Sequence, residues 1–232
     1  MRSETLHQVY DALFGQYGAR HWWPADSQFE VMVGAVLTQN TSWTNVERSL
    51  ARLREIAPMD PGAILALSVD VLADALRPVG YFNVKAGRLQ SLCRWLLDQG
   101  GPQKLEERDT PSLRQALLAV HGVGPETADD ILLYAFGRPV FVVDAYTRRL
   151  FGRLGFVSDA ESYETLRAAI EQALPQDSRL YNEYHALIVE HAKTTCRTKP
   201  LCGGCVLREA CPSAQDQVLG KAKSKGLGRV QR

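Results

Sequence analysis

The spacing of apolar residues constrains this chain more than any other feature of its sequence. Apolar side chains recur at intervals of three and four residues, which places them on one face of an α-helix. Two stretches with this spacing contain Phe29, Val33, Val36 and Leu37, and Leu89, Leu92, Leu96 and Leu97. No stretch alternates with a period of two over more than about five residues. The pattern predicts an all-α protein with about ten helices and no substantial sheet.

Capping residues and prolines predict where individual helices begin and end. Asp109-Thr110-Pro111 precedes an apolar-periodic stretch that runs to Val120. We expect Thr110 to cap this helix and Pro111 to lie in its first turn. Residues 158–164 begin another helix, which Pro175 ends.

The composition is that of an ordinary globular protein and leaves the kind of partner open. The 232 residues include 27 basic and 26 acidic side chains, enough chain for one large core or two small lobes. A net charge of +1 neither demands nor excludes a nucleic-acid partner, because acids elsewhere can balance a basic face. The apolar runs are far shorter than the ~18 residues that cross a bilayer, and the N-terminus lacks the order of a signal peptide. We therefore expect a cytoplasmic protein without a membrane partner.

The C-terminal segment, residues 212–232, differs in composition from the rest. It has five basic residues against one acid, Asp216; the basic residues are Lys221, Lys223, Lys225, Arg229 and Arg232. This composition predicts a mobile basic tail, which either keeps the chain soluble or attracts phosphates.

Residues 117–128 (LLAVHGVGPETA) have the pattern of two helices joined by a tight turn. We expect one helix to end at Val120, Gly122-Val123-Gly124 to form the turn, and Pro125 to begin the next helix. The glycines allow positive φ, and without side chains they let a partner approach the backbone. The free amides at the helix start then point toward an anion. The segment predicts a helix-hairpin-helix that binds a DNA phosphate, although a glycine helix cap explains part of the pattern as well.

Asp144 follows the apolar run Val140–Val143 and precedes a further helical stretch. Its carboxylate at a helix start can cap the backbone amides. It can also be aimed into a cleft for catalysis. Both interpretations remain open from the residues alone.

Four of the five cysteines, Cys196, Cys202, Cys205 and Cys211, lie within sixteen residues. Such crowding in a chain without an export signal favours a metal site over disulfides. Four thiolates suit either zinc or a [4Fe–4S] cluster, but zinc sites usually combine two closely spaced pairs, and this motif has one. We therefore expect a [4Fe–4S] cluster that fixes a basic loop. Cys93 is expected to be an ordinary buried residue, and His185 and His191 to be packing or surface residues.

Together these motifs resemble the endonuclease III class of the helix-hairpin-helix (HhH-GPD) DNA glycosylases. The resemblance rests on the glycine turn with Thr127-Ala128, on Ala135-Phe136-Gly137, on Val143-Asp144 and on the four cysteines. The first cysteine gap is one residue shorter than is common in that class. The resemblance implies a two-lobed protein that binds DNA between its lobes. Residues 25–137 would form a six-helix lobe, and residues 1–24 and 138–211 the cluster lobe.

The same resemblance implies roles for individual residues. Gly122, Val123, Gly124 and Thr127 would contact DNA. Bifunctional members have a Schiff-base lysine at the position that Glu126 occupies here, and a carboxylate cannot replace an amine nucleophile. Asp144 would then stabilise the oxocarbenium-like sugar and activate a water molecule, with Glu126 adding negative potential.

A second set of motifs indicates the base. Trp22-Trp23-Pro24, Leu37–Thr41 and Val142–Tyr146 are similar to the endonuclease-III-type 3-methyladenine DNA glycosylases, which also have glutamate in place of lysine. This likeness suggests that Trp22, Trp23 and Trp43 hold a flipped base, although each is as readily a core residue. Cationic alkylated purines would be favoured by stacked tryptophans.

Residues that enter the gap left by the flipped nucleotide are also implied by analogy. Gln39 or Asn40 would enter from one side and Tyr81 from the other, though Tyr81 is equally a packed turn residue. Lys85 and Arg88 would contact phosphates, or else be solvated helix charges.

The resulting expectation is a monomeric, nucleoid-associated, monofunctional DNA glycosylase acting on double-stranded DNA with a damaged base. Two alternatives remain: a bifunctional glycosylase/AP lyase for oxidised pyrimidines that uses another lysine such as Lys85, and a DNA-binding paralogue with weak or no catalysis.

Overall fold

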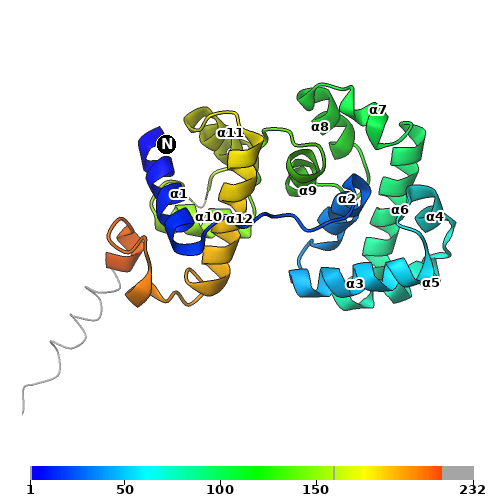
Figure 1. Cartoon of the computed structure of the whole chain (residues 1–232), viewed down its shortest axis with the longest axis horizontal. Helices are drawn as coiled ribbons and strands as arrows, with labels where there is room; N and C mark the ends of the chain where they lie inside the picture. The colour runs from blue at the N-terminus through cyan, green and yellow to red at the C-terminus, as the bar shows by residue number, and fades with distance from the viewer. Residues whose placement is uncertain (1, 159, 216–232) are drawn as a thin grey trace, which may run out of the picture. The chain divides into compact units, whose positions relative to one another are not determined.

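A computed structural model describes residues 2–158 and 160–215, and within these ranges helices are the only regular secondary structure (Figure 1). The all-α prediction is confirmed. Up to residue 211 the described residues form twelve α-helices, two short 3₁₀ turns (η1, Arg77–Val79; η3, Cys202–Gly204) and one π-helical turn (η2, Ile131–Ala135). None of the helices in these ranges combines the length and apolar character that a bilayer crossing needs.

The described residues divide into two compact units, one within residues 23–140 and the other made of residues 2–22 with the described part of 141–215. The resemblance placed these changes at 24/25 and 137/138. Residues 212–215, expected to belong to the tail, are helical, and Ala214 is buried. The five basic residues of the expected tail lie outside the described residues.

The 23–140 unit is built around one buried helix. In α2 every residue after Gln28 is buried, which its nearly continuous apolar sequence explains. It packs against α6, α9 and η2. The helices of this unit are α2 (Gln28–Leu37), α3 (Trp43–Ile56), α4 (Pro61–Ala66), α5 (Val69–Ala75), α6 (Phe82–Asp98), α7 (Pro102–Glu106), α8 (Thr110–Leu118) and α9 (Pro125–Asp130). There are eight rather than the expected six, and Asp60 and Ser68 each cap a short helix of their own.

The start of α8 corrects one prediction. Asp109, and not Thr110, is the capping residue: its carboxylate accepts hydrogen bonds from the Ser112 amide at 2.8 Å and the Ser112 hydroxyl at 3.0 Å. Asp109 has extended backbone geometry, whereas Thr110 is already the first helical residue. A cap must precede the first helical residue, so the carboxylate takes the role.

The other unit joins the two ends of the chain. The first helix, α1 (Ser3–Tyr17), packs against α12 (Ser178–Thr194), which also packs against α10 (Ala145–Arg153). The remaining α-helix is α11 (Tyr163–Ala173). Buried aromatic residues fill this core, and the Tyr184 hydroxyl donates to the Leu6 carbonyl at 2.9 Å. Because α1 depends on α12 for its packing, the N-terminal segment belongs to this unit despite the sequence distance.

Candidate functional site

The glycine turn forms a helix-hairpin between α8 and α9. As predicted, α9 begins at Pro125, and it continues into η2, so that residues 125–135 form one helical run. Gly122 has φ +88°, which only glycine adopts readily. Gly124 differs from the prediction, since its φ of −93° suits any residue. A Cβ at Gly124 would meet nothing within 4 Å, so this residue, which directly precedes α9, faces open space.

The hairpin loop is held from inside by Gln39. The Gln39 amide nitrogen donates to the Gly122 carbonyl at 3.1 Å and to the Thr127 hydroxyl at 2.8 Å, while Arg88 donates to its amide oxygen. Thr127 is 4% exposed and Val123 is 6% exposed. These two side chains therefore anchor the loop to the core, and the DNA contact expected of the turn through its backbone stays a prediction. Gln39 likewise fastens the loop, and Asn40 is the exposed member of the pair.

Tyr81 and Lys85 lie at the start of α6 in very different surroundings. Tyr81 is 71% exposed and has φ +47°, so it is not a packed turn residue. Lys85 is buried, and its ammonium group donates to the carbonyls of Leu37 and Val79, both at 2.9 Å. Burial, together with the nearby charge of Arg88, lowers the pKa of Lys85 to about 8. The predicted phosphate contact by Lys85 is wrong, since its donors point into the protein.

Asp144 caps α10 with one carboxylate oxygen, so the capping interpretation is confirmed. Its Oδ1 accepts from the Thr147 amide at 2.7 Å, and its Oδ2 lies 3.6 Å from His185 Nε2. The side chain is 13% exposed. Burial alone would raise the pKa of Asp144, but His185 and the Thr147 amide outweigh burial and hold it below its usual value. The carboxylate is therefore ionised at neutral pH and fixed at two points.

Glu126 lies in the first turn of α9 and is exposed. An acid in this turn interacts favourably with the helix dipole. Its exposed position is compatible with a role at the protein surface facing a ligand.

Of the three predicted base-pocket tryptophans, the structure brings two together. The rings of Trp23 and Trp43 meet edge to face with centroids 4.9 Å apart, and the Tyr134 ring lies 5.0 Å from Trp23. All three are half-buried against the core. A Cβ at Gly34 would lie 3.0 Å from the Trp23 ring, so the lack of a side chain at Gly34 lets the indole pack directly against α2. Trp22 belongs to the other unit.

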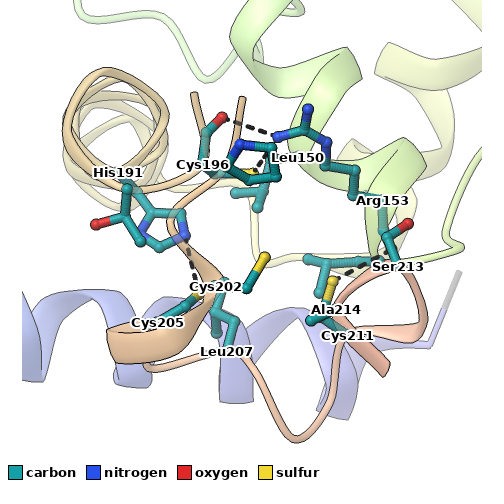
Figure 2. A pocket seen from close by; sticks show the side chains of 13 residues that line it. Leu150, Arg153, His191, Cys196, Cys202, Cys205, Leu207, Cys211, Ser213 and Ala214 are labelled. Atoms are coloured by element: carbon teal, nitrogen blue, oxygen red, sulfur yellow. Dashed lines mark hydrogen bonds between the residues drawn. The ribbon is translucent and has the colours of Figure 1, made fainter. Parts of the chain in front are cut away.

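The four late cysteines line one hollow (Figure 2) with about 380 Å³ of empty space, part of it open to solvent. Cys196 and Cys211 are buried, and Cys202 and Cys205 are half-buried. Burial raises the pKa of the Cys205 thiol, as does negative charge on the other cysteines. A cationic centre would offset this repulsion, so the donor set fits a thiolate-bound metal group. Within the described ranges, no three or more His, Cys, Asp or Glu side chains are already arranged to hold a metal ion.

Neighbouring helices hold this loop. Arg153 of α10 donates to the Cys196 sulfur at 3.2 Å and to the Arg197 carbonyl at 2.7 Å. His191 Nε2 lies 3.6 Å from the Cys205 sulfur, and its Nδ1 is 2.9 Å from the Tyr17 hydroxyl. The loop carries three exposed basic side chains, Arg197, Lys199 and Arg208. Cys93 is buried elsewhere in the core, as predicted.

Comparison with known proteins identifies the family. The model of the HhH-GPD superfamily of base excision DNA repair proteins matches residues 33–176, which include the hairpin and Asp144. The chain is a member of the HhH-GPD superfamily. The resemblance drawn from the sequence motifs is thereby confirmed.

Individual relatives of this HhH-GPD protein agree. It is 45% identical to a protein of Methanocaldococcus jannaschii named as a DNA repair glycosylase, over 90% of this chain and 97% of the relative. Endonuclease III solved in a complex with DNA shares the fold, with 23% identity, a TM-score of 0.81, and coverage of 94% and 99%. The Helicobacter pylori 3-methyladenine DNA glycosylase bound to 1,N6-ethenoadenine is 30% identical, with a TM-score of 0.69 and coverage of 83% and 98%.

Several residues of this HhH-GPD protein that matter for the site were not found from the sequence. His185 was expected to be a packing or surface residue, yet it faces Asp144. Arg88 was expected to contact phosphate or solvent, yet it binds Gln39. Tyr134 lies within the apolar stretch of residues 131–136, which has the composition of an ordinary buried helix. Each acts through a residue far away in sequence, so helical spacing carried no signal for it.

Proposed function

We propose that this HhH-GPD protein is a monofunctional DNA glycosylase that hydrolyses the N-glycosidic bond of a damaged base in double-stranded DNA. The observation that carries the proposal is Asp144: an ionised carboxylate, fixed by Thr147 and His185 and partly open to solvent. A carboxylate held in this way can stabilise positive charge without reorganising.

The proposed chemistry needs no amine. As the bond between C1′ and the base breaks, the base takes the electron pair and positive charge develops on the sugar, opposite Asp144. A water oxygen then bonds to C1′ and gives its proton to Asp144. The product is an abasic sugar. Glu126 occupies the position of the lysine of bifunctional relatives, so no Schiff base forms there.

DNA binding is proposed for three exposed features of the 23–140 unit. The open space at Gly124 lets a phosphate approach the amides of α9. Asn40 and Tyr81, both exposed with positive φ, would fill the gap left by the extruded nucleotide. Gln39 supports the hairpin and is not the gap-filling residue in this proposal.

Alkylated purines are the proposed substrates. The paired rings of Trp23 and Trp43 offer aromatic surface for a cationic base. A cationic base also leaves as a neutral molecule, which explains how the reaction proceeds without a general acid. The 30% identity with a 3-methyladenine glycosylase supports this choice.

A [4Fe–4S] cluster is proposed for the cysteine hollow, held by Cys196, Cys202, Cys205 and Cys211. The motif has one closely spaced cysteine pair where zinc sites usually have two, which supports a multi-iron cluster over a single zinc ion. When bound, the cluster would supply structural rigidity to the loop. Arg197, Lys199 and Arg208 would then face phosphates from a fixed position.

Single-turnover base release tests the activity. Wild type should release 3-methyladenine from methylated duplex DNA, and Asp144→Asn should lose about 100-fold or more in rate. Asp177→Asn is the matched control, because Asp177 caps α12 through the amide of Arg179. Equal rates for wild type and Asp144→Asn would remove Asp144 from the mechanism. Release from a thymine glycol duplex instead would favour the oxidised-pyrimidine alternative, and no release from either would favour the DNA-binding paralogue.

Borohydride trapping on abasic DNA tests the monofunctional assignment. Wild type should form no covalent adduct, and Glu126→Lys, which places an amine at the lysine position, should form one. An adduct with wild type would contradict the proposed role of Glu126.

A further inference from the structure

Two cations on α6 form a hydrogen-bond network that the proposed chemistry does not use. Lys85 and Arg88 lie one turn apart near the start of this helix. Lys85 donates to the carbonyls of Leu37, the last residue of α2, and Val79, the last residue of η1. One buried ammonium group thus joins the ends of two helical elements that are far apart in sequence.

The two hydrogen bonds of the Lys85 ammonium group, rather than apolar packing, explain why a lysine occupies this buried position. The last carbonyls of a helix have no partner within the helix, and the negative end of its dipole favours a cation. An ammonium group with three donors can serve two such ends at once. Burying a charge costs far more than burying an apolar side chain of similar size. Lys85 therefore acts as a shared cap for α2 and η1.

Both segments that follow these carbonyls are strained and exposed. Asn40, three residues after Leu37, has φ +56°, and Tyr81, two residues after Val79, has φ +47°. Residues other than glycine rarely have positive φ values, so the surrounding structure must hold Asn40 and Tyr81 in this backbone conformation. Lys85 fixes the point at which each of these turns begins.

Arg88 connects the first turn to the hairpin. It donates to the Gln39 side chain, which in turn donates to the Gly122 carbonyl and the Thr127 hydroxyl. A Cβ at Gly122 would lie 2.2 Å from Arg88 Cγ, so the glycine makes the space that the arginine occupies. The network therefore reaches three turns, residues 38–42, 79–81 and 120–124, from one face of α6.

We propose that Lys85 and Arg88 are positioning residues that hold these three turns as one preformed surface for DNA with an extruded nucleotide. The inference rests on the proposed function. A surface that is already ordered loses less entropy on binding, so the network raises affinity for the distorted duplex in particular. Neither cation touches the DNA; each acts through the turns that it holds.

Amide hydrogen exchange without DNA tests the network itself. Reporter amides are those of Thr41, Gly80 and Val123, which are hydrogen-bonded within the three turns. Lys85→Met should speed exchange at Thr41 and Gly80 by about 10-fold, and Arg88→Met should do so at Thr41 and Val123.

Arg94→Met is the matched control, because Arg94 is an exposed residue of the same helix, and it should change none of the three. Unchanged exchange at the reporters, or an equal rise throughout the unit, would overturn the inference. Arg88 is only half-buried, so its variant keeps the test decisive if Lys85→Met does not fold.

Binding to two duplexes tests the functional consequence. Arg88→Met should weaken binding to a duplex with an abasic-site analogue by about 10-fold and binding to the intact duplex by less than about 3-fold. In a background of Asn40→Ala with Tyr81→Ala, the same substitution should have little further effect, because the residues that it positions are gone.

Equal weakening on both duplexes would make Arg88 a phosphate contact, and an undiminished effect in the double-alanine background would also refute positioning. If wild type binds neither duplex, the proposed function fails, and the exchange experiment still decides whether the network exists.

Discussion

Gly122→Ala is expected to be among the most destabilising single changes in the hairpin. An alanine at φ +88° is strained by roughly 1–2 kcal/mol. Its Cβ would also lie 2.2 Å from Arg88 Cγ, 2.6 Å from Cδ and 2.9 Å from Cβ. Because the Arg88 Cβ is fixed to α6, rotating the arginine cannot relieve the clash completely. The bond from Arg88 to Gln39 would be lost, at a cost of about 1.5–3 kcal/mol.

Together these effects predict a loss of about 3–5 kcal/mol in the free energy of unfolding. For a chain of this size the melting midpoint should fall by roughly 10 °C, measured by circular dichroism without DNA. Gly124→Ala is the control, since its φ of −93° is ordinary and its Cβ would meet nothing. It should change stability by less than about 0.5 kcal/mol.

Gly122→Ala should mainly lower stability, whereas Gly124→Ala should mainly lower the affinity for DNA. Gly124→Ala should weaken binding to an abasic-analogue duplex by about 10-fold, because a methyl group stands before the amides of α9. Fluorescence anisotropy at a temperature where both variants are folded measures this. If Gly122→Ala melts with wild type, or if Gly124→Ala is equally destabilised, the account of the two glycines is refuted.

Three other predictions concern charges and thiols. Folding lowers the pKa of Asp144. The stabilising contribution of its carboxylate is therefore complete above the unfolded pKa of about 3.9 and is lost as pH falls through the folded-state pKa. The difference in melting midpoint between wild type and Asp144→Asn should be constant from pH 7 to 5 and shrink below about pH 4, and a difference that grows at low pH would contradict the lowered pKa. Asp129 is fully buried and paired with Arg114 Nε at 2.6 Å, so Arg114→Met should cost about 3–5 kcal/mol in urea unfolding. Adding Asp129→Asn should recover part of this loss, and no recovery would argue against a stabilising Arg114–Asp129 ion pair. Cys205→Ser should abolish bound iron and the visible absorbance of the purified protein, whereas Cys93→Ser, at a buried thiol away from the hollow, should keep both; a colourless wild type with stoichiometric zinc would overturn the cluster assignment.

Local signals in the sequence located much of the fold. Helical spacing identified the helical elements because burying one face of a helix imposes that spacing on nearby residues. Pro125 and Asp144 were placed correctly because caps and prolines act within one turn. The hairpin glycines were found together, but only Gly122 has the positive φ that was expected of both.

The part of the candidate site that was not predicted depends on contacts between segments far apart in the sequence. Lys85 and Arg88 lie three residues apart on a helix, which is the pattern of solvated charges. The sequence around them does not reveal that the Lys85 ammonium donates to helix-end carbonyls and that Arg88 donates to Gln39. His185 lies 41 positions from Asp144 in the sequence, yet the packing of α12 on α10 brings them to 3.6 Å. Single-sequence spacing cannot report such pairs, since it contains no information about which helices meet.

The helix α10 has a consequence for how the protein responds to oxidative damage. Asp144 caps its N-terminus, and Arg149 and Arg153 near its other end bind the Cys196 carbonyl at 2.9 and 3.2 Å. Nine residues of helix are about 14 Å long and bend little. If oxidation of the thiols released the loop, Arg149 would keep its bond to the Ala192 carbonyl at 3.0 Å, whereas Arg153 would lose its acceptors, which lie in residues 196–198. The end of α10 that carries Arg153 would then be freer to shift, and the Asp144 carboxylate at the other end would move with the helix while staying chemically intact.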